Sequence, residues 1–403
     1  MLLILSALVA AIGSASGVPV PMVAPAEIQP TPLRFEPGFK SSMATDAACS
    51  ACQQVRAASR DACEAHCDAI LAPGQAAKCK GTCLKMAIVA DKFPDADACV
   101  SIGYCRNAKA PVWSEPLKGN ATTLPVVLMH GVNSDAASME NMKKWIETSY
   151  PGTYVKNVEI GDGKLSSVFM DMNDQVANFC EQLSDDPNLA NGINLLGFSQ
   201  GTAITRGYVS RCNFPRVHNY VSLAGVQAGV FGAGFVPSWL DPALSATPYE
   251  DWAQHAFSFC QYWKDPYDLD LYMEKSTFLA DLENCRPDKN PLYKENIGGL
   301  NKLILIYSSR DDVIRPRPSG WFEFYAPLTE LVVVPLNESA LYTEDWVGVR
   351  KLDEENKLIR EETDCLHSEH NMQTCYHFIE QFVLTYFAPP PPADLKALRE
   401  QHQ

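Results

Sequence analysis

Short apolar runs rich in β-branched residues alternate along the chain with longer segments of helical periodicity. The runs lie at 126–129, 193–196, 217–223, 303–307 and 331–334. Parallel strands need a crossover connection, usually a helix, so this alternation predicts βαβ units. The sequence therefore predicts an α/β fold in which helices flank a mainly parallel sheet.

Changes in composition divide the 403 residues into six segments. We expect a signal peptide at 1–17, a Pro-rich linker at 18–45, a cysteine-rich module at 46–107, a second linker at 108–119, the α/β domain at 120–388 and a Pro-rich tail at 389–403. The first segment is an apolar run that ends in small residues, as a signal peptidase requires, and an uncleaved membrane anchor is the alternative.

Charge and cysteine content restrict the partners and the compartment. The formal charge of −15 argues against a nucleic-acid partner, which would need phosphate-neutralising Lys and Arg. Fourteen cysteines and two sequons, at Asn120 and Asn337, predict disulfides, glycosylation and an oxidising lumen. The chain end carries no KDEL-type signal, which leaves a lysosomal or a secreted protein as the expectation.

The strongest chemical motif is Gly197-Phe198-Ser199-Gln200-Gly201, which follows an apolar run and precedes a segment of helical pattern at 202–211. A sharp turn between strand and helix exposes a serine hydroxyl over the sheet edge, and glycines permit the close approach that this turn needs. We therefore predict Ser199 as a nucleophile. The backbone N–H groups of Gln200 and of Val132, in the loop after the first core strand, are the predicted oxyanion donors.

A nucleophilic serine needs a histidine base and an acid, in the chain order serine, acid, histidine for this motif. Asp311 follows the apolar run 303–307 and is the predicted acid, with Asp312 in reserve. His367 and His370 share the polar loop at 364–374, and the residue pattern leaves both open as the base. Cys365 and Cys375 bracket this loop, which predicts a disulfide that holds it.

With these residues placed, residues 124–387 resemble the palmitoyl-protein thioesterases, which are α/β-hydrolases. The resemblance rests on His130-Gly131, Asn173-x-Gln175-Val176, the Ser199 motif, Gly225-x-Gln227-x-Gly229-Val230-Phe231-Gly232, Tyr262-Trp263-x-Asp265-Pro266, Phe278-Leu279-Ala280-Asp281, Trp321-Phe322-x-Phe324-Tyr325 and Leu341-Tyr342-Thr343-Glu344-Asp345. Two departures are Val132-Asn133-Ser134, where the family has a Gly-rich loop, and Thr202, where it usually has glycine.

The resemblance implies a hydrolase that removes palmitate and other long acyl chains from cysteines of S-acylated proteins or peptides, with no cofactor. It implies Ser199 as nucleophile, Asp311 as acid and His370 as base, although His367 stays open, and it implies a Cys180–Cys212 disulfide. Cys260–Cys285 follows by elimination. Aromatic residues of the segment 226–277 either line an acyl groove or form plain core. A lipase or carboxylesterase acting on O-acyl lipids is the alternative function, and a lipid-binding protein with a vestigial hydrolase domain is a second one.

The cysteine-rich module has its own predicted pairs. A spacing of four places Cys63 and Cys67 on one helix face, and Cys79 and Cys83 on another, which predicts Cys63–Cys83 and Cys67–Cys79. The outer pairs are then Cys49–Cys105 and Cys52–Cys99, and we expect no metal site because zinc-binding thiolates suit a reducing compartment. The two ends of the module resemble a saposin-like helical domain, which implies transient contact with a lipid or membrane surface. A stapled appendage that only protects or positions the second domain is the alternative.

Overall fold

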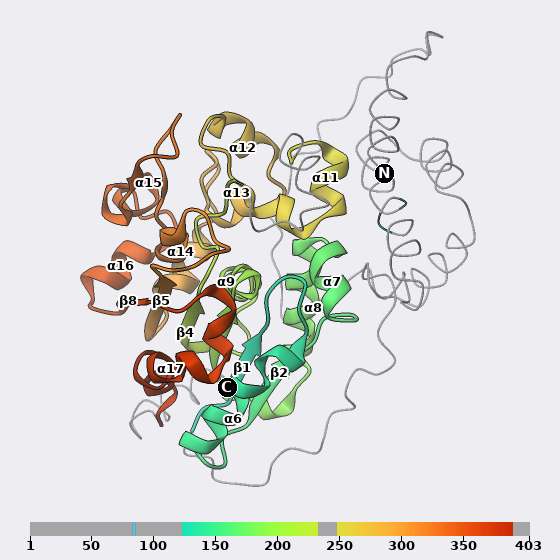
Figure 1. Cartoon of the computed structure of the whole chain (residues 1–403), viewed down its shortest axis with the longest axis vertical. Coiled ribbons are helices and arrows are strands. Elements are labelled where there is room, and N and C mark those ends of the chain that lie inside the picture. The colour runs from blue at the N-terminus through green and yellow to red at the C-terminus, as the bar shows by residue number, and fades with distance from the viewer. Residues whose placement is uncertain (1–82, 84, 86–122, 233–247, 390–403) are drawn as a thin grey trace.

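The computed structural model describes residues 83, 85, 123–232 and 248–389 (Figure 1). The predicted signal peptide, both linkers, Asn120 and the tail beyond residue 389 lie outside the described residues, as does the cysteine-rich module apart from Cys83 and Lys85. Cys83 is buried and disulfide-bonded, and its predicted partner Cys63 is outside the described residues. In the described part of the chain, no helix has the length and apolar character needed to span a membrane.

A six-stranded sheet forms the centre of the described structure, and every neighbouring pair of its strands is parallel. The strands are β1 (Val126–Met129), β2 (Val155–Val158), β3 (Ile193–Phe198), β4 (Val217–Leu223), β5 (Lys302–Ser308) and β8 (Leu358–Thr363), in the order β2-β1-β3-β4-β5-β8. The predicted α/β fold with a parallel sheet is confirmed. The α/β-hydrolase class implied by the resemblance is confirmed with it.

The sequence pattern found the central strands but missed both edge strands. β1 and β3 are buried along their whole length and read as continuous apolar runs, as strands covered on both faces do. β2 contains Lys156, which is buried in an ion pair with Asp186 at 3.1 Å, and the half-buried Asn157. β8 contains Arg360, Glu361 and Glu362, because this edge strand keeps contact with solvent.

The prediction that 331–334 belongs to this sheet is wrong. There, β7 (Val333–Val334) pairs antiparallel with β6 (Phe324–Tyr325) in a separate two-stranded sheet. Leu331 is 94% exposed, so the apolar character of this run does not reflect a buried strand.

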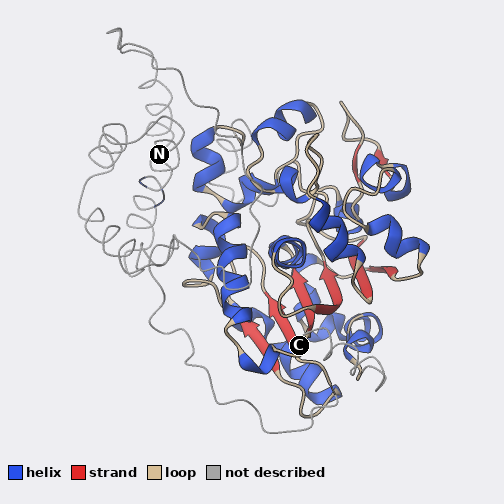
Figure 2. Cartoon of the chain, turned by 180° about the vertical axis from the view of Figure 1, so that it is seen from behind, coloured by secondary structure: helices blue, strands red, loops and turns tan. Residues whose placement is uncertain are grey.

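Alternate strand residues pack into two apolar layers, one on each face of the sheet. Helices lie on both sides of the sheet (Figure 2). On one face, Val127 and Leu195 pack with residues of α8 (Met172–Ser184) and α9 (Gln200–Arg211). On the other face, Val126 and Leu196 pack with α6 (Glu140–Ser149) and α17 (Tyr376–Phe382). Burial of both layers holds the strands rigidly, so the loops at their ends have fixed positions.

The remaining helices belong mostly to the segments between β2 and β3 and after β4. Helices α11, α12 and α13 lie together at the opposite end of the molecule from α6 and α17 (Figure 1). The α-helices are α7 (Lys164–Phe169), α11 (Asp251–Ala256), α12 (Leu269–Lys275), α13 (Leu279–Leu282), α14 (Pro291–Gly298), α15 (Ala340–Thr343) and α16 (Val349–Glu354). The 3₁₀ helices are η1 (Ala136–Met139), η2 (Pro187–Leu189), η3 (Ser258–Tyr262), η4 (Arg317–Trp321), η5 (Leu336–Glu338), η6 (His367–Asn371), η7 (Gln373–Cys375) and η8 (Leu384–Phe387).

Two of the predicted disulfides are present among the described residues. Cys180–Cys212 connects α8 to the end of α9, with a Cα–Cα distance of 6.2 Å. Cys365–Cys375 closes the loop that follows β8, with a Cα–Cα distance of 6.0 Å. Both predictions are confirmed.

The predicted Cys260–Cys285 bond is wrong, because both thiols are free. Cys260 is fully buried in η3, whereas the Cys285 thiol donates to the Ala280 carbonyl at 3.3 Å. Pairing by elimination assumes that every cysteine is bonded, but a disulfide forms only where the backbone brings two Cα atoms within about 7 Å with facing Cβ atoms.

Candidate active site

Ser199 occupies a strained turn between β3 and α9. Its φ of 56° and ψ of −126° lie in a region that side chains rarely adopt, which is the backbone strain expected of a nucleophile turn. A Cβ on Gly197 would lie 2.6 Å from the Gly201 carbonyl oxygen, and one on Gly201 would lie 2.4 Å from that of Met129. The two glycines are therefore required by the close approach of strand and helix, as the motif predicts.

His367 connects Ser199 to Asp311. Its Nε2 lies 2.9 Å from Ser199 Oγ, and its Nδ1 lies 2.8 Å from Asp311 Oδ2. The three residues follow β3, β5 and β8, whose carboxyl ends meet at one edge of the parallel sheet. We call these three side chains the Ser199–His367–Asp311 relay. It has the arrangement of nucleophile, base and orienting acid.

The placement of His370 as the base is contradicted by the structure. Its Nε2 lies 2.9 Å from Thr363 Oγ1 and its Nδ1 lies 3.0 Å from the His367 carbonyl oxygen, so both ring nitrogens are used away from Ser199. The loop enters the site from β8 with His367 first, and η6 then carries His370 behind it. His370 is fully buried, and burial lowers its pKa, which keeps the ring neutral.

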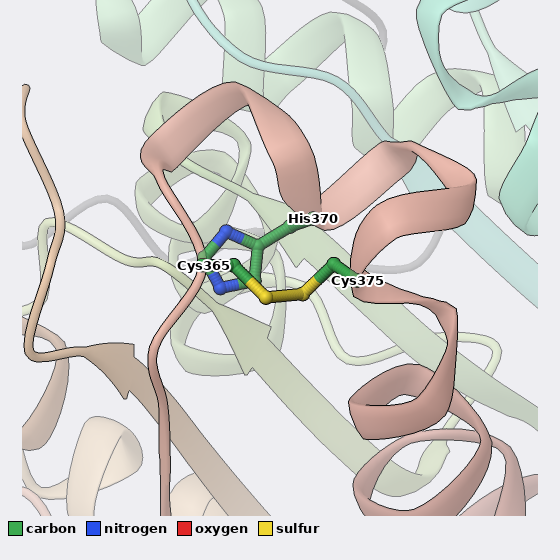
Figure 3. A group of neighbouring side chains, drawn as sticks. All are labelled: Cys365, His370 and Cys375. Carbon is green, nitrogen blue, oxygen red and sulfur yellow. A yellow bond between two sulfur atoms is a disulfide. The ribbon is translucent and has the colours of Figure 1, made fainter.

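His370 packs instead against the Cys365–Cys375 disulfide (Figure 3). The atoms of these three residues that could in principle bind a metal ion, a ring nitrogen of His370 and the two sulfurs, lie within 4.8 Å of one another. The two sulfurs are bonded to each other, so they offer no thiolates to a metal ion. The cluster is structural: the disulfide and the buried ring brace the loop that carries His367.

The electrostatics of Asp311 suit an orienting carboxylate. Burial raises its pKa, but the hydrogen bond and the attraction to His367, together with the backbone N–H groups of Ile314 and Val313, outweigh this, and the pKa lies below its ordinary value. Both N–H groups donate to Oδ1 at 2.8 Å, leaving Oδ2 for the histidine. The reserve residue, Asp312, accepts the backbone N–H of His367 at 3.1 Å and so holds the loop.

The loop after β1 lies directly beside Ser199. A Cβ on Gly131 would be 2.9 Å from that of Ser199, which places the start of the loop against the serine. His130 Nε2 lies 3.0 Å from Glu159 Oε1, and Glu159 Oε2 accepts the N–H of Ala136 at 2.8 Å. His130 thus shapes the loop, and no motif in the sequence points to Glu159 as its partner.

The two departures from the family pattern keep the local geometry. Asn133 has φ = 52°, and asparagine is one of the few residues besides glycine that adopt this conformation readily. Thr202 is buried, and its hydroxyl donates to the Ser199 carbonyl at 2.7 Å and accepts the Val226 N–H at 3.1 Å. The Thr202 hydroxyl therefore supports the nucleophile turn.

The described aromatic residues of the segment 226–277 mainly form core. Phe257, Phe259, Tyr262 and Trp263 are each at most 3% exposed and belong to the large apolar layer. Phe231 and Trp252 are partly buried against the same layer. For these residues the alternative of plain core is supported, while Phe235 and Trp239 lie outside the described residues.

Comparison with known proteins supplies the family. The model for palmitoyl protein thioesterases matches residues 125–367, from the first strand to the histidine of the relay. A palmitoyl-protein thioesterase 3 from Dictyostelium discoideum is 48% identical over 268 residues, covering 66% of this chain and 93% of the relative. Palmitoyl-protein thioesterase 1 from Caenorhabditis elegans is 34% identical over 253 residues, covering 59% and 85%.

A third relative is the human lysosomal thioesterase PPT2, which is 30% identical over 254 residues, covering 61% of this chain and 82% of that protein. The family match spans more than half of the chain, and these relatives align over most of their own length. The chain belongs to the palmitoyl-protein thioesterase family.

Proposed function

We propose that this chain is a serine hydrolase that cleaves long-chain fatty acyl thioesters from cysteine residues of S-acylated proteins or peptides. The observation that carries the proposal is the Ser199–His367–Asp311 relay, with its two contacts of 2.9 and 2.8 Å. Membership of the thioesterase family supports the acyl thioester as the substrate class.

The relay accounts for the first half of the reaction. His367 Nε2 takes the proton from Ser199 Oγ, and the oxygen attacks the carbonyl carbon of the thioester. The charge that develops on the carbonyl oxygen is held by the backbone N–H groups of Gln200 and Val132, our proposed oxyanion donors. When the C–S bond breaks, the cysteine sulfur takes the proton from His367 and leaves as a thiol, so an acyl-enzyme remains on Ser199 and His367 is neutral again.

Water completes the cycle. His367 takes a proton from water, and the hydroxide attacks the acyl carbon. His367 then returns the proton to Ser199 Oγ as the ester bond breaks, which releases the fatty acid and restores Ser199. Asp311 stays ionised throughout, because its pKa lies below its ordinary value, and it holds the His367 ring with Nε2 toward the serine. No metal or cofactor enters any step of the proposed chemistry.

The compartment and the domain organisation are part of the same proposal. The relatives named lysosomal thioesterase PPT2, together with the two observed disulfides, support passage through the secretory route to a lysosome-like compartment or to the medium. Asn337 is exposed at η5, so a glycan there would meet solvent. We propose the segments assigned from composition as the domain boundaries, with the cysteine-rich module contacting lipid.

The test compares a palmitoyl-cysteine peptide with the matched oxygen ester. We expect Ser199→Ala to abolish release of palmitate from the thioester. Ser210→Ala is the matched control, because it removes a buried serine hydroxyl from the adjacent helix α9, and this hydroxyl makes no hydrogen bond. Turnover that survives Ser199→Ala contradicts the mechanism, and a preference for the oxygen ester shifts the assignment to a lipase or carboxylesterase.

A further inference from the structure

The side chain of Gln200 uses both ends of its carboxamide in a buried network. Its Nε2 donates to the Ser167 carbonyl at 2.7 Å and faces Gln175 Oε1 at 3.4 Å. Its Oε1 accepts from the hydroxyls of Ser258 and Tyr262, both at 2.9 Å. Gln200 is 1% exposed, so the carboxamide depends on these partners rather than on water. We call this set of contacts the Gln200 clamp.

The clamp joins three segments that are distant in sequence. Ser167 lies in α7, Gln175 lies in α8, and Ser258 and Tyr262 lie in η3 of the aromatic segment. The single Ser258 hydroxyl proton is shared between Gln200 Oε1 and the Ser167 carbonyl, which lies 2.7 Å from Ser258 Oγ, and this closes a ring of polar contacts around the carboxamide. Burial raises the pKa of Tyr262 well above its ordinary value, so its hydroxyl stays a donor at every working pH.

Gln200 is also the first residue of α9, directly after Ser199. The first N–H groups of a helix have no partner within the helix, so the Gln200 N–H is available to a ligand at this end. The side chain and the N–H are attached to the same Cα atom. Fixing the carboxamide from three sides therefore fixes the direction of the peptide N–H next to the serine.

We infer that the Gln200 side chain is a positioning residue, which aims the backbone N–H of Gln200 at the oxyanion through the clamp. This inference rests on the proposed function, in which that N–H stabilises the transition state. Through Ser258 and Tyr262, the clamp also makes η3 part of the support for the reaction centre. An N–H aimed at the oxyanion stabilises the transition state more than the bound thioester, so loosening the clamp lowers kcat and leaves KM nearly unchanged.

The experiment uses Gln200→Met, which keeps the length of the side chain without its polar atoms, and Tyr262→Phe, which removes a single donor. Loss of one oxyanion donor costs about 10²–10³ in kcat, and a donor that is misdirected rather than lost costs less. We expect kcat on the palmitoyl-cysteine peptide to fall by about 10- to 100-fold in Gln200→Met and by about 3- to 10-fold in Tyr262→Phe, with KM within about twofold of wild type.

Tyr272→Phe is the matched control, because Tyr272 is also fully buried in the aromatic segment but its hydroxyl contacts Glu283, at 2.9 Å, outside the clamp. We expect its kcat to stay within about twofold of wild type. An equal loss of kcat in Tyr272→Phe and Tyr262→Phe would show a general packing effect and would overturn the inference. If Gln200→Met does not fold, Tyr262→Phe and Ser258→Ala still decide the question, because each removes one donor to the carboxamide.

A second measurement separates the clamp from the proposed substrate. A long-chain alkyl fluorophosphonate reacts with an activated serine whatever the natural substrate is, and its phosphoryl oxygen occupies the oxyanion position. We expect the rate of labelling to fall in Gln200→Met and Tyr262→Phe by the same factors as kcat. Wild-type protein that labels but does not cleave the thioester refutes the proposed function while the labelling rates still test the clamp. Variants that label and turn over as fast as wild type refute the clamp.

Discussion

Replacing each of the two loop histidines by glutamine is the sharpest test of the site. Glutamine keeps a polar side chain of similar volume but cannot take a proton from the serine. We expect His367→Gln to lower kcat by about 10⁴-fold or more, because His367 Nε2 lies 2.9 Å from Ser199 Oγ and is the base of the relay. The fold should tolerate this change, since glutamine has a similar size and the backbone N–H of residue 367 still donates to Asp312.

His370→Gln should act on stability instead. The ring makes two hydrogen bonds, to Thr363 Oγ1 at 2.9 Å and to the His367 carbonyl at 3.0 Å, each worth about 1 kcal/mol. Losing both costs about 2 kcal/mol, which lowers the Tm by roughly 4–8 °C in a domain of this size. We expect kcat to stay within about tenfold of wild type below the transition.

The assay measures palmitate release from the cysteine peptide, and thermal unfolding is followed on the same samples. The reasoning fails if His370→Gln, still folded at the assay temperature, loses more than about 10³-fold in kcat while His367→Gln remains active. That outcome would identify His370 as the base, which is the assignment implied by the family resemblance.

The pH dependence of stability gives an independent check on His370. Burial lowers its pKa, so below about pH 6.5 the unfolded chain binds a proton that the folded chain excludes. The stability of the wild type then declines as the pH falls, by up to about 1.4 kcal/mol per pH unit, until the folded-state pKa is reached. His370→Gln lacks this contribution, so urea unfolding should show the stability gap between the two proteins narrowing below pH 6.5. A gap that stays constant from pH 7.5 to 5 contradicts a buried neutral ring.

Three further predictions concern the acid and the cysteines. Asp311→Asn should lower kcat by about 10⁴-fold in the thioester assay with a near-wild-type circular dichroism spectrum, and retained activity would exclude it as the orienting acid. Removing the Cys365–Cys375 disulfide as a double serine variant opens a loop with a sequence separation of 10 residues, which should cost about 3 kcal/mol in urea unfolding; an unchanged midpoint would deny it a bracing role. Peptide mapping should find Cys260 and Cys285 alkylated after unfolding without reductant, because both thiols are free. In the native protein Cys285 should react slowly, because burial raises its pKa to about 11. Protection of both cysteines after unfolding would indicate a Cys260–Cys285 disulfide and contradict the structure.

Local chemistry accounts for what could be read from the sequence. The turn around Ser199 was predictable because a strand, two glycines and a helix impose the same steric demands wherever they meet. Asp311 was predictable because polar residues just after a buried parallel strand lie at the carboxyl edge of the sheet. The two edge strands were missed because polar residues interrupt the apolar run that marks the central strands: Lys156, paired in the interior with Asp186, and Asn157 in β2, and exposed charged residues in β8.

The choice between His367 and His370 depended on the path of the loop. Two residues three apart in a 3₁₀ helix lie on the same side of it, so the local pattern gives no preference between them. The structure separates them because the loop leaves β8 with His367 facing Ser199, and His370 is then covered by the disulfide and by Thr363.

The sequence by itself determined the parallel α/β architecture, the serine at its turn, the acid after its strand and the Cys365–Cys375 bond, because each depends on spacing and on the pattern of burial along one segment. Only the tertiary structure decided which histidine completes the relay, that Cys260 and Cys285 stay apart, and that Gln200 is held from three segments. These features depend on distances between side chains that the chain brings together from far apart, and such distances are set by how the layers pack on the sheet.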